Sequence, residues 1–160
     1  MSTSEVELAL ERLAAETSVS RLLNATCVEL VNLLGASRCS VSRIIGDLLV
    51  ELSDHSRSGE HRPLELFLVS DYPLTLEVID AGEPRVVTRS DPNADPAEAS
   101  LLERLGFDSL LMLPLRSRGQ NWGLLEVYAD DHPFGQREIE LATAFSDRVD
   151  ALLAELETGR

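Results

Sequence analysis

Residues 108–129, with the sequence DSLLMLPLRSRGQNWGLLEVYA, contain two apolar stretches separated by a short polar turn. Residues 108–116 and 122–129 have the length and composition of strands, and residues 117–120 are typical of a turn. A longer segment, residues 136–157, follows, and in it Ile139, Phe145 and Val149 recur at helical spacing. This part of the chain therefore predicts a β-hairpin followed by a helix of about six turns.

Working outward from this hairpin, the same periodicities predict the rest of the fold. Helices are expected at residues 5–16, 19–34, 73–81 and 96–105, and strands at 38–45, 48–54, 64–69 and 85–88. Ser18 and Asp95 precede two of these helices as N-cap residues, and Gly35 and Gly106 follow the same two as stop signals. Because the strands come in hairpins, the fold class is α+β, with a central antiparallel sheet and the terminal helices on one face.

Strand alternation divides the sheet into two faces of different character. One face is apolar and should meet the terminal helices: Cys39, Val41, Leu111, Leu113, Leu115, Leu125, Val127 and Ala129. The other face is mixed, and its members, with two aromatic residues from the middle segment, are the candidate ligand-binding residues: Ser40, Ser42, Phe67, Tyr72, Met112, Glu126 and Tyr128. This face could be solvated, with Glu126 paired to Arg38 or Arg43, or it could be roofed by residues 70–106 and enclose a small-molecule pocket.

Charge and cysteine content exclude several classes of function. The 160 residues include 14 Lys+Arg and 28 Asp+Glu, which gives a formal net charge of −14, and every basic residue is an arginine. Nucleic acid and anionic membranes are therefore not expected partners, and neither P-loop nor Schiff-base lysine chemistry is available. Two cysteines twelve positions apart, Cys27 and Cys39, predict no zinc site and fit a reducing cytoplasm.

The length and the ends of the chain predict one soluble domain. Residues 1–160 are expected to form a single unit with its core at about 18–155 and an N-terminal helix within 1–17. The first seven residues carry acids and no bases, so no signal peptide is expected. Neither is a transmembrane helix, because no run of about 18 apolar residues exists.

The terminal helices carry more apolar residues than a single buried stripe needs. The surplus residues are Leu8, Leu141, Ala144 and Ala151. They favour a homodimer formed through the terminal helices, although a wide core stripe would also use them.

Three segments together resemble the GAF domain family: LLGASRCSVSRI, DAGEPRVVTRSD, and the long block that begins LGFDSLLMLPLRSRGQ and runs into the last helix. The resemblance covers roughly residues 18–155. It implies a sheet of about six strands with the terminal helices on one face and short helices, loops and a pocket on the other. It also implies a sensory or regulatory module of signal transduction, fused to or partnered with an output domain, as in bacterial regulators.

The resemblance bears on cofactors as well. The cyclic-nucleotide members carry an Asn-Lys-Phe-Asp-Glu motif, which a chain without lysine lacks. Cys27 and Cys39 lie in the wrong elements for the bilin members, and His55, His61 and His132 are expected in loops, so covalent bilin and haem are both disfavoured. No cofactor and no metal is predicted.

Two alternatives to a ligand sensor stay open. The chain could be an interaction module that dimerises without any ligand. It could also be an enzyme similar to the free methionine sulfoxide reductases, which share the fold and need a reactive thiol. Because Cys27 and Cys39 are assigned to the core and no Ser/His/Asp arrangement appears, no catalytic residue is predicted.

Overall fold

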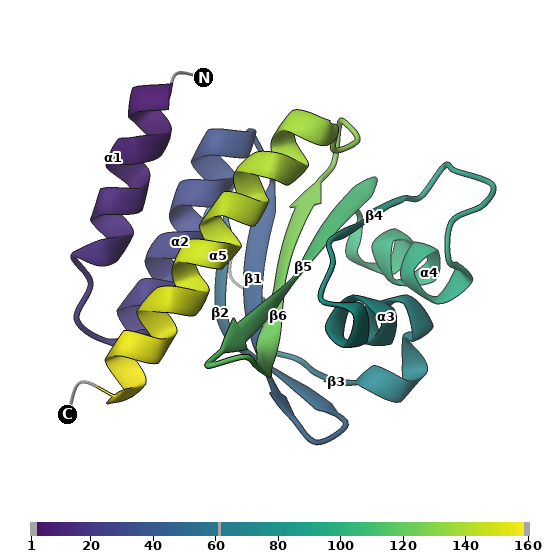
Figure 1. Ribbon diagram of the computed structural model, residues 1–160. Coiled ribbons are helices and arrows are strands. Elements are labelled where there is room, and N and C mark those ends of the chain that lie inside the picture. The colour runs from purple at the N-terminus through teal and green to yellow at the C-terminus, as the bar shows by residue number, and fades with distance from the viewer. Residues whose placement is uncertain (1–2, 61, 159–160) are drawn as a thin grey trace.

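Six strands form one antiparallel sheet in the order β3-β2-β1-β6-β5-β4. The computed structural model describes residues 3–60 and 62–158. Helices α1, α2 and α5 lie together on one face, and α3 and α4 lie on the other (Figure 1). The α+β architecture expected from the sequence is confirmed.

The element bounds follow the predicted ones closely. The strands are β1 (Arg38–Ile45), β2 (Leu48–Ser56), β3 (Leu66–Leu68), β4 (Arg85–Thr88), β5 (Ser109–Ser117) and β6 (Gln120–Ala129). The helices are α1 (Thr3–Ala14), α2 (Val19–Leu34), α3 (Pro73–Ala81), α4 (Pro96–Leu105) and α5 (Gln136–Thr158), with a short 3₁₀ turn at Val69–Asp71.

Capping residues explain why two helices match their predicted bounds. The side chain of Ser18 accepts a hydrogen bond from the backbone N–H of Arg21 at the start of α2. Asp95 does the same for the N–H of Glu98 at the start of α4. Gly106 ends α4 with a φ of 84°, a left-handed conformation that glycine adopts without a steric penalty.

The sheet separates two hydrophobic cores. The terminal-helix core joins α1, α2 and α5 to the apolar sheet face, and its strand residues include all eight predicted ones. The roof core joins the same strands to α3 and α4, which we call the roof helices; its sheet members include Leu110, Met112, Leu124 and Tyr128. Alternation along each strand therefore assigned the two faces correctly, because successive side chains of a strand point to opposite sides.

The structure differs from the predicted elements mainly in the lengths of β2 and β3. Strand β2 continues to Ser56, and its His55 pairs with Cys39, so the expectation that His55 lies in a loop is wrong. Pairing with β1 extends β2 through polar residues that carry no strand signal of their own. Strand β3 is shorter than predicted, and His61 lies outside the described residues.

Candidate functional site

The sheet face beneath the roof helices carries polar side chains that are withdrawn from solvent. Ser40 lies opposite Glu126 in the β1–β6 register, and Arg38 lies opposite Tyr128, so all four share this face. Each of them is at most 7% exposed. The mixed face is therefore a buried polar layer and not a solvated surface.

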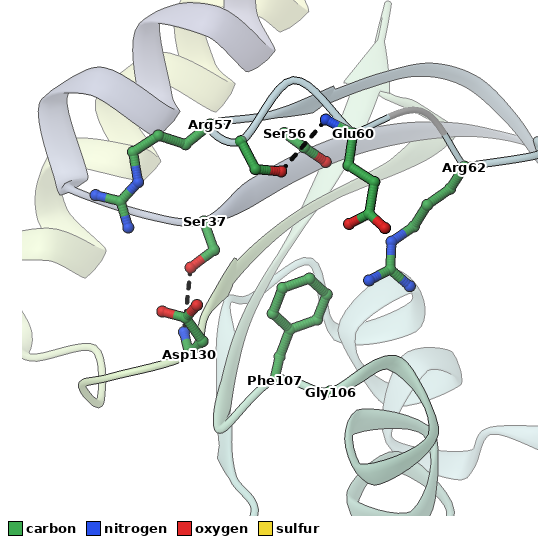
Figure 2. Close-up of a pocket in the computed structure, with 9 residues that line it drawn as sticks. Ser37, Ser56, Arg57, Glu60, Arg62, Gly106, Phe107 and Asp130 are labelled. Carbon is green, nitrogen blue, oxygen red and sulfur yellow. Dashed lines mark hydrogen bonds between the residues drawn. The ribbon is translucent and has the colours of Figure 1, made fainter.

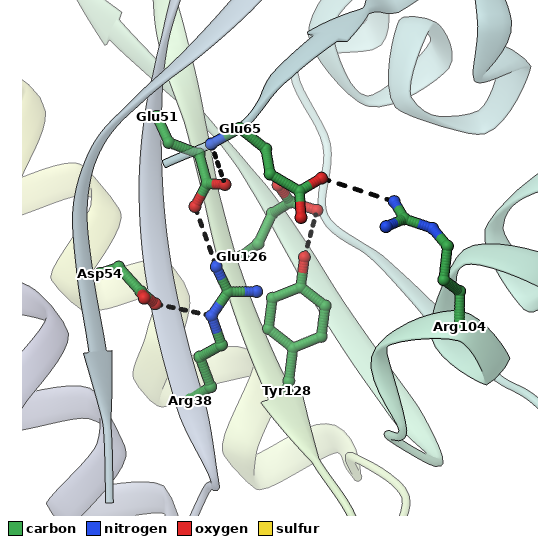
Figure 3. A network of polar contacts seen from close by, with 7 residues as sticks. All are labelled: Arg38, Glu51, Asp54, Glu65, Arg104, Glu126 and Tyr128. Atoms are coloured by element: carbon green, nitrogen blue, oxygen red, sulfur yellow. Dashed lines mark hydrogen bonds and ion pairs between the residues drawn. The ribbon is translucent and has the colours of Figure 1, made fainter. Parts of the chain in front are cut away.

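Arg38 is at the centre of this layer (Figure 3). Its Nη2 donates to Glu51 Oε2 at 2.9 Å, and its Nε donates to Asp54 Oδ1 at 2.6 Å. The guanidinium carbon also lies 5.2 Å from the centre of the Tyr128 ring. Burial opposes the charge of Arg38, but the neighbouring acidic groups outweigh it and raise the pKa of the guanidinium. Arg38 is thus a permanent cation held by two carboxylates.

Among the described residues, no positively charged side chain is bonded to Glu126. Its Oε2 accepts a hydrogen bond of 3.2 Å from the Tyr128 hydroxyl. Burial, followed by repulsion from Glu98 and Glu51, raises the pKa of Glu126 to about 8. Its carboxyl group is therefore mostly protonated at neutral pH.

The roof contributes polar atoms that face the same layer. Thr75 on α3 donates a hydrogen bond to Glu98 on α4, and its hydroxyl also lies 3.5 Å from the sulfur of Met112. Met112 is the direct β5 neighbour of Glu126. Burial raises the pKa of Glu98 as well. The polar groups of sheet and roof therefore meet in one region.

An open hollow of about 310 Å³ adjoins this region (Figure 2). Phe107 lines it, and its ring lies 5.0 Å from the ring of Tyr128, so the hollow and the buried layer share a wall. Arg62 also lines this hollow, and its guanidinium carbon lies 5.3 Å from the centre of the Phe107 ring. Its Nη2 donates a hydrogen bond of 3.1 Å to the carbonyl of Leu105. Among the described residues, the buried Nε–H of Arg62 has no hydrogen-bond acceptor.

The structure groups most of the candidate ligand-binding residues. Ser40, Ser42, Met112, Glu126 and Tyr128 share the buried layer, as the sequence predicts. The other two pack against the roof core: Phe67 on β3 and Tyr72 before α3 contact each other edge-on at 5.9 Å, and Tyr72 lies near Glu98 and Arg104. A ligand-binding role for all seven stays a prediction.

Sequence reasoning missed Glu51, Thr75 and Glu98 as members of the layer, and it named Arg38 only as a possible partner of Glu126, whereas Arg38 bonds to Glu51 and Asp54. Glu51 carries a usable signal, because it interrupts the apolar residues of β2 at a position that shares the Leu49 face. Glu98 lies in the first turn of α4, where a carboxylate is typical of helix capping, but its carboxylate turns inward to Thr75. No local pattern shows that α3 and α4 would bring these side chains over the sheet.

The surplus apolar residues of the terminal helices lie as expected at or near the surface. Leu8 on α1 is 53% exposed, Ala144 and Ala151 on α5 are exposed, and Leu141 is half-buried. They leave apolar side chains at the surface of α1 and α5, and their use in a dimer stays a prediction.

The cysteines lie on the other side of the sheet from the polar layer. Cys27 on α2 and Cys39 on β1 are both buried in the terminal-helix core. Burial, together with its neighbour Cys27, raises the pKa of the Cys39 thiol well above its ordinary value. The Cys39 thiol is therefore protonated at neutral pH, and both cysteines are shielded from solvent.

Two features are absent from residues 3–60 and 62–158. These residues include no group of three or more His, Cys, Asp or Glu side chains placed to hold a metal ion. None of their helices is long and apolar enough to cross a membrane.

Solved structures share this fold at low sequence identity. A phycocyanobilin-bound GAF domain from a cyanobacterial phytochrome is 19% identical, with a TM-score of 0.84 over 97% of this chain and 98% of that one. A phycoerythrobilin-bound GAF domain from a cyanobacterial phytochrome is 18% identical, with a TM-score of 0.86 over 96% and 97%. A bacteriophytochrome from the photosynthetic bacterium R. palustris matches at 13% identity and a TM-score of 0.86, over 98% of this chain but only 38% of its own length.

These structures correct one expectation. From the positions of Cys27 and Cys39 in the sequence, a covalent bilin is not expected. That expectation is wrong: the solved structures that resemble this chain include GAF domains with bound bilins, so bilins are among the ligands to be considered for this fold.

Sequence comparison gives the family directly. No curated protein matches the chain. The GAF domain model matches residues 18–153, which is most of the chain and nearly the span that the resemblance suggested. The chain therefore belongs to the GAF domain family.

Proposed function

We propose that this chain is a non-catalytic sensory domain of signal transduction that binds a small molecule between the sheet and the roof helices. The observation that supports it best is the buried polar layer, where Glu51, Glu98 and Glu126 are withdrawn from water beside Arg38. Buried ionisable groups destabilise a fold unless they are paired, and they gather at binding sites for that reason. The hollow beside Phe107 gives a ligand an approach to this layer.

Bilins are the first ligands to test, because the structural neighbours hold phycocyanobilin, phycoerythrobilin and biliverdin. The full chain would be mixed with biliverdin or phycocyanobilin and followed by absorption spectroscopy. Native mass spectrometry of protein from its own host would detect any other retained molecule. A bound molecule of either kind supports the proposal, and denaturing electrophoresis would then show whether a chromophore is covalently attached.

A pair of variants that each remove a buried hydroxyl locates the ligand. Tyr128→Phe removes one from the buried layer, whereas Thr26→Val removes one from α2, which packs on the other face of the sheet. We expect Tyr128→Phe to weaken binding about tenfold and Thr26→Val to change it less than twofold. If neither host-purified protein nor a panel of bilins and metabolites gives any bound species, the chain is not a ligand sensor.

The signal would leave through the terminal helices. We propose that α1 and α5 pair with those of a second copy in the cytoplasm and pass changes to an output domain. The exposed Leu8, Ala144 and Ala151 support this role, because their side chains would otherwise stay in water. Light scattering should show that the wild type is a dimer and that the double variant Leu8→Glu with Ala151→Glu is a monomer. The control Leu76→Glu, on the exposed side of α3, should remain a dimer. A monomeric wild type would contradict the proposed pairing of the terminal helices.

A further inference from the structure

The buried layer contains more negative groups than positive ones, and this imbalance indicates which ligand it would bind. This inference rests on the proposed function, since it concerns the ligand of the same site. Within the described residues, Arg38 is the one positively charged side chain that is buried, and it is already bonded to Glu51 and Asp54. Glu98 and Glu126 are left with hydroxyl partners, Thr75 and Tyr128.

The carboxyl groups lie close to one another by strand register and roof contact. Glu126 is the direct neighbour of Met112 on one side and of Ser40 on the other. Met112 touches Thr75, which is bonded to Glu98, so Glu98 approaches Glu126 from above. Glu51 lies on β2, opposite Ser42. Figure 3 shows Glu51 joined to the Arg38 guanidinium and Glu126 joined to the Tyr128 hydroxyl.

A separate feature indicates that a hydrogen-bonding group is missing from this layer. Ser42 is 1% exposed and lies on the same face, opposite Leu124 and Glu51. Its hydroxyl has no hydrogen-bond partner among the described residues. Buried hydroxyls are nearly always hydrogen-bonded in folded proteins, so this one indicates an absent partner.

We propose that the ligand presents a protonated nitrogen, as an amine, amidine or guanidine, to Glu126 and Glu98 and donates a further N–H to Ser42. A cation would provide the charge that these carboxyl groups lack, and its N–H groups match carboxylate oxygens in geometry. An anion would find no unpaired cation among the described residues of this layer, because Arg38 is already bonded to Glu51 and Asp54. A metal ion is a poorer match than an organic cation, because the described residues offer no metal-binding cluster.

Proton release accompanies this mode of binding. The groups that face Glu126 are Tyr128 on its own strand, Arg38 on β1, Glu51 on β2 and Glu98 on α4. A cation placed among them would lower the pKa of Glu126 from about 8 and expel its proton. Binding at pH 7 should therefore release up to one proton per ligand.

Three probes of the same shape and different charge test the proposal: benzamidine, benzamide and benzoate. Each would be titrated into the full chain while backbone amide signals are followed by NMR. We expect benzamidine to shift the amides of Ser42, Glu51 and Glu126 and to bind at least tenfold more tightly than benzamide, with no binding of benzoate. Calorimetry in phosphate and in Tris buffer would measure the proton released.

Two variants keep the test specific. Glu126→Gln has the shape of the protonated carboxyl group, and Glu98→Gln can still accept the bond from Thr75, so both should fold. Each should weaken benzamidine at least fivefold. The matched control is Glu77→Gln, which removes an exposed charge from α3 and should leave binding unchanged.

The outcomes separate this inference from the proposed function. If benzamide or benzoate shifts the same amides as strongly as benzamidine, the site exists but its preference for a cation is wrong. Benzamidine binding that neither variant weakens, or that releases no proton, also overturns the inference. If no probe of any charge shifts these amides and host-purified protein carries no molecule, the proposed function falls with it.

Discussion

Thr75 Oγ1 lies 2.6 Å from Glu98 Oε2, and this hydrogen bond joins the two roof helices inside the protein. Both residues are almost fully buried. The bond connects α3 to α4 directly above the polar layer, so it fixes the position of the roof relative to the sheet. A ligand beneath the roof would meet this pair.

Replacing Thr75 with Val should therefore destabilise the fold. The variant keeps the shape of the side chain but leaves the buried Glu98 carboxyl without its donor, at a cost of about 1–3 kcal/mol. Thr26→Val is the matched control, because Thr26 is equally buried but bonds to the carbonyl of Leu22 within its own helix. Urea unfolding should show a loss of less than about 1 kcal/mol for the control. Equal losses in the free energy of unfolding would show that the Thr75–Glu98 bond stabilises the fold no more than a hydroxyl bond within one helix.

Removal of the Arg38 charge should be more damaging. Arg38→Met leaves Glu51 and Asp54 buried without their cation, which typically costs about 3–5 kcal/mol. Arg89→Met breaks a surface pair with Asp108 and should cost about 1 kcal/mol or less. Chemical denaturation of both variants measures the difference. A similar small loss in each would contradict a structural role for Arg38.

Stability should fall as pH rises from about 5 to 8.5. Glu126 has a pKa of about 8 in the folded protein and an ordinary value of 4.5, so its full contribution to stability is present below about 4.5 and is lost as pH rises through 8. Asp150, with a pKa raised chiefly by burial to about 6, acts in the same direction over a lower range. Thermal unfolding across this range should show a declining Tm for the wild type. Glu126→Gln should flatten the decline above pH 6, and a parallel decline in that variant would exclude Glu126 as its cause.

Gly123 should tolerate no side chain. An added Cβ would overlap the backbone oxygen of Ser42, so strands β1 and β6 would have to separate. We expect Gly123→Ala to lose about 2 kcal/mol or more. Gly135→Ala, where the nearest atom is 3.8 Å away, should be nearly neutral. Comparison of their Tm values tests this, and a neutral Gly123→Ala would show that the two strands are not held so closely.

Both thiols should be unreactive in the folded protein. Cys27 and Cys39 are buried in the terminal-helix core, and the raised pKa of Cys39 keeps it protonated. A chromogenic disulfide reagent should therefore react only after urea is added. Rapid reaction in native buffer would reopen the thiol-enzyme alternative, and an assay for methionine sulfoxide reduction would then decide it.

The sequence predicted the parts of the fold that local signals determine. Asp95, Pro96 and Gly106 set the bounds of α4, and alternation placed Glu126 and Ser42 on the roof side. Five of the seven candidate ligand-binding residues fall in the buried layer for the same reason.

The remaining features depend on contacts between distant segments. Glu98 has the same sequence signature whether its carboxylate caps a helix or turns inward, and only the docking of α3 decides between them. His55 lies in β2 because β1 pairs with it, which no pattern around His55 indicates. Arg38 bonds to Glu51 and Asp54 and not to Glu126, because β2 pairs with β1 and brings these two carboxylates to the guanidinium.

Because the central strands β1, β5 and β6 turn alternate residues toward the terminal helices and toward the roof, the two halves of this protein can evolve at different rates. Substitutions at Ser40, Ser42 or Glu126 change what lies under the roof, while Cys39, Val41 and Val127 continue to hold α2 and α5. A related protein could therefore bind a different ligand under the roof and keep the packing of its terminal helices, because only every second residue of the central strands would differ.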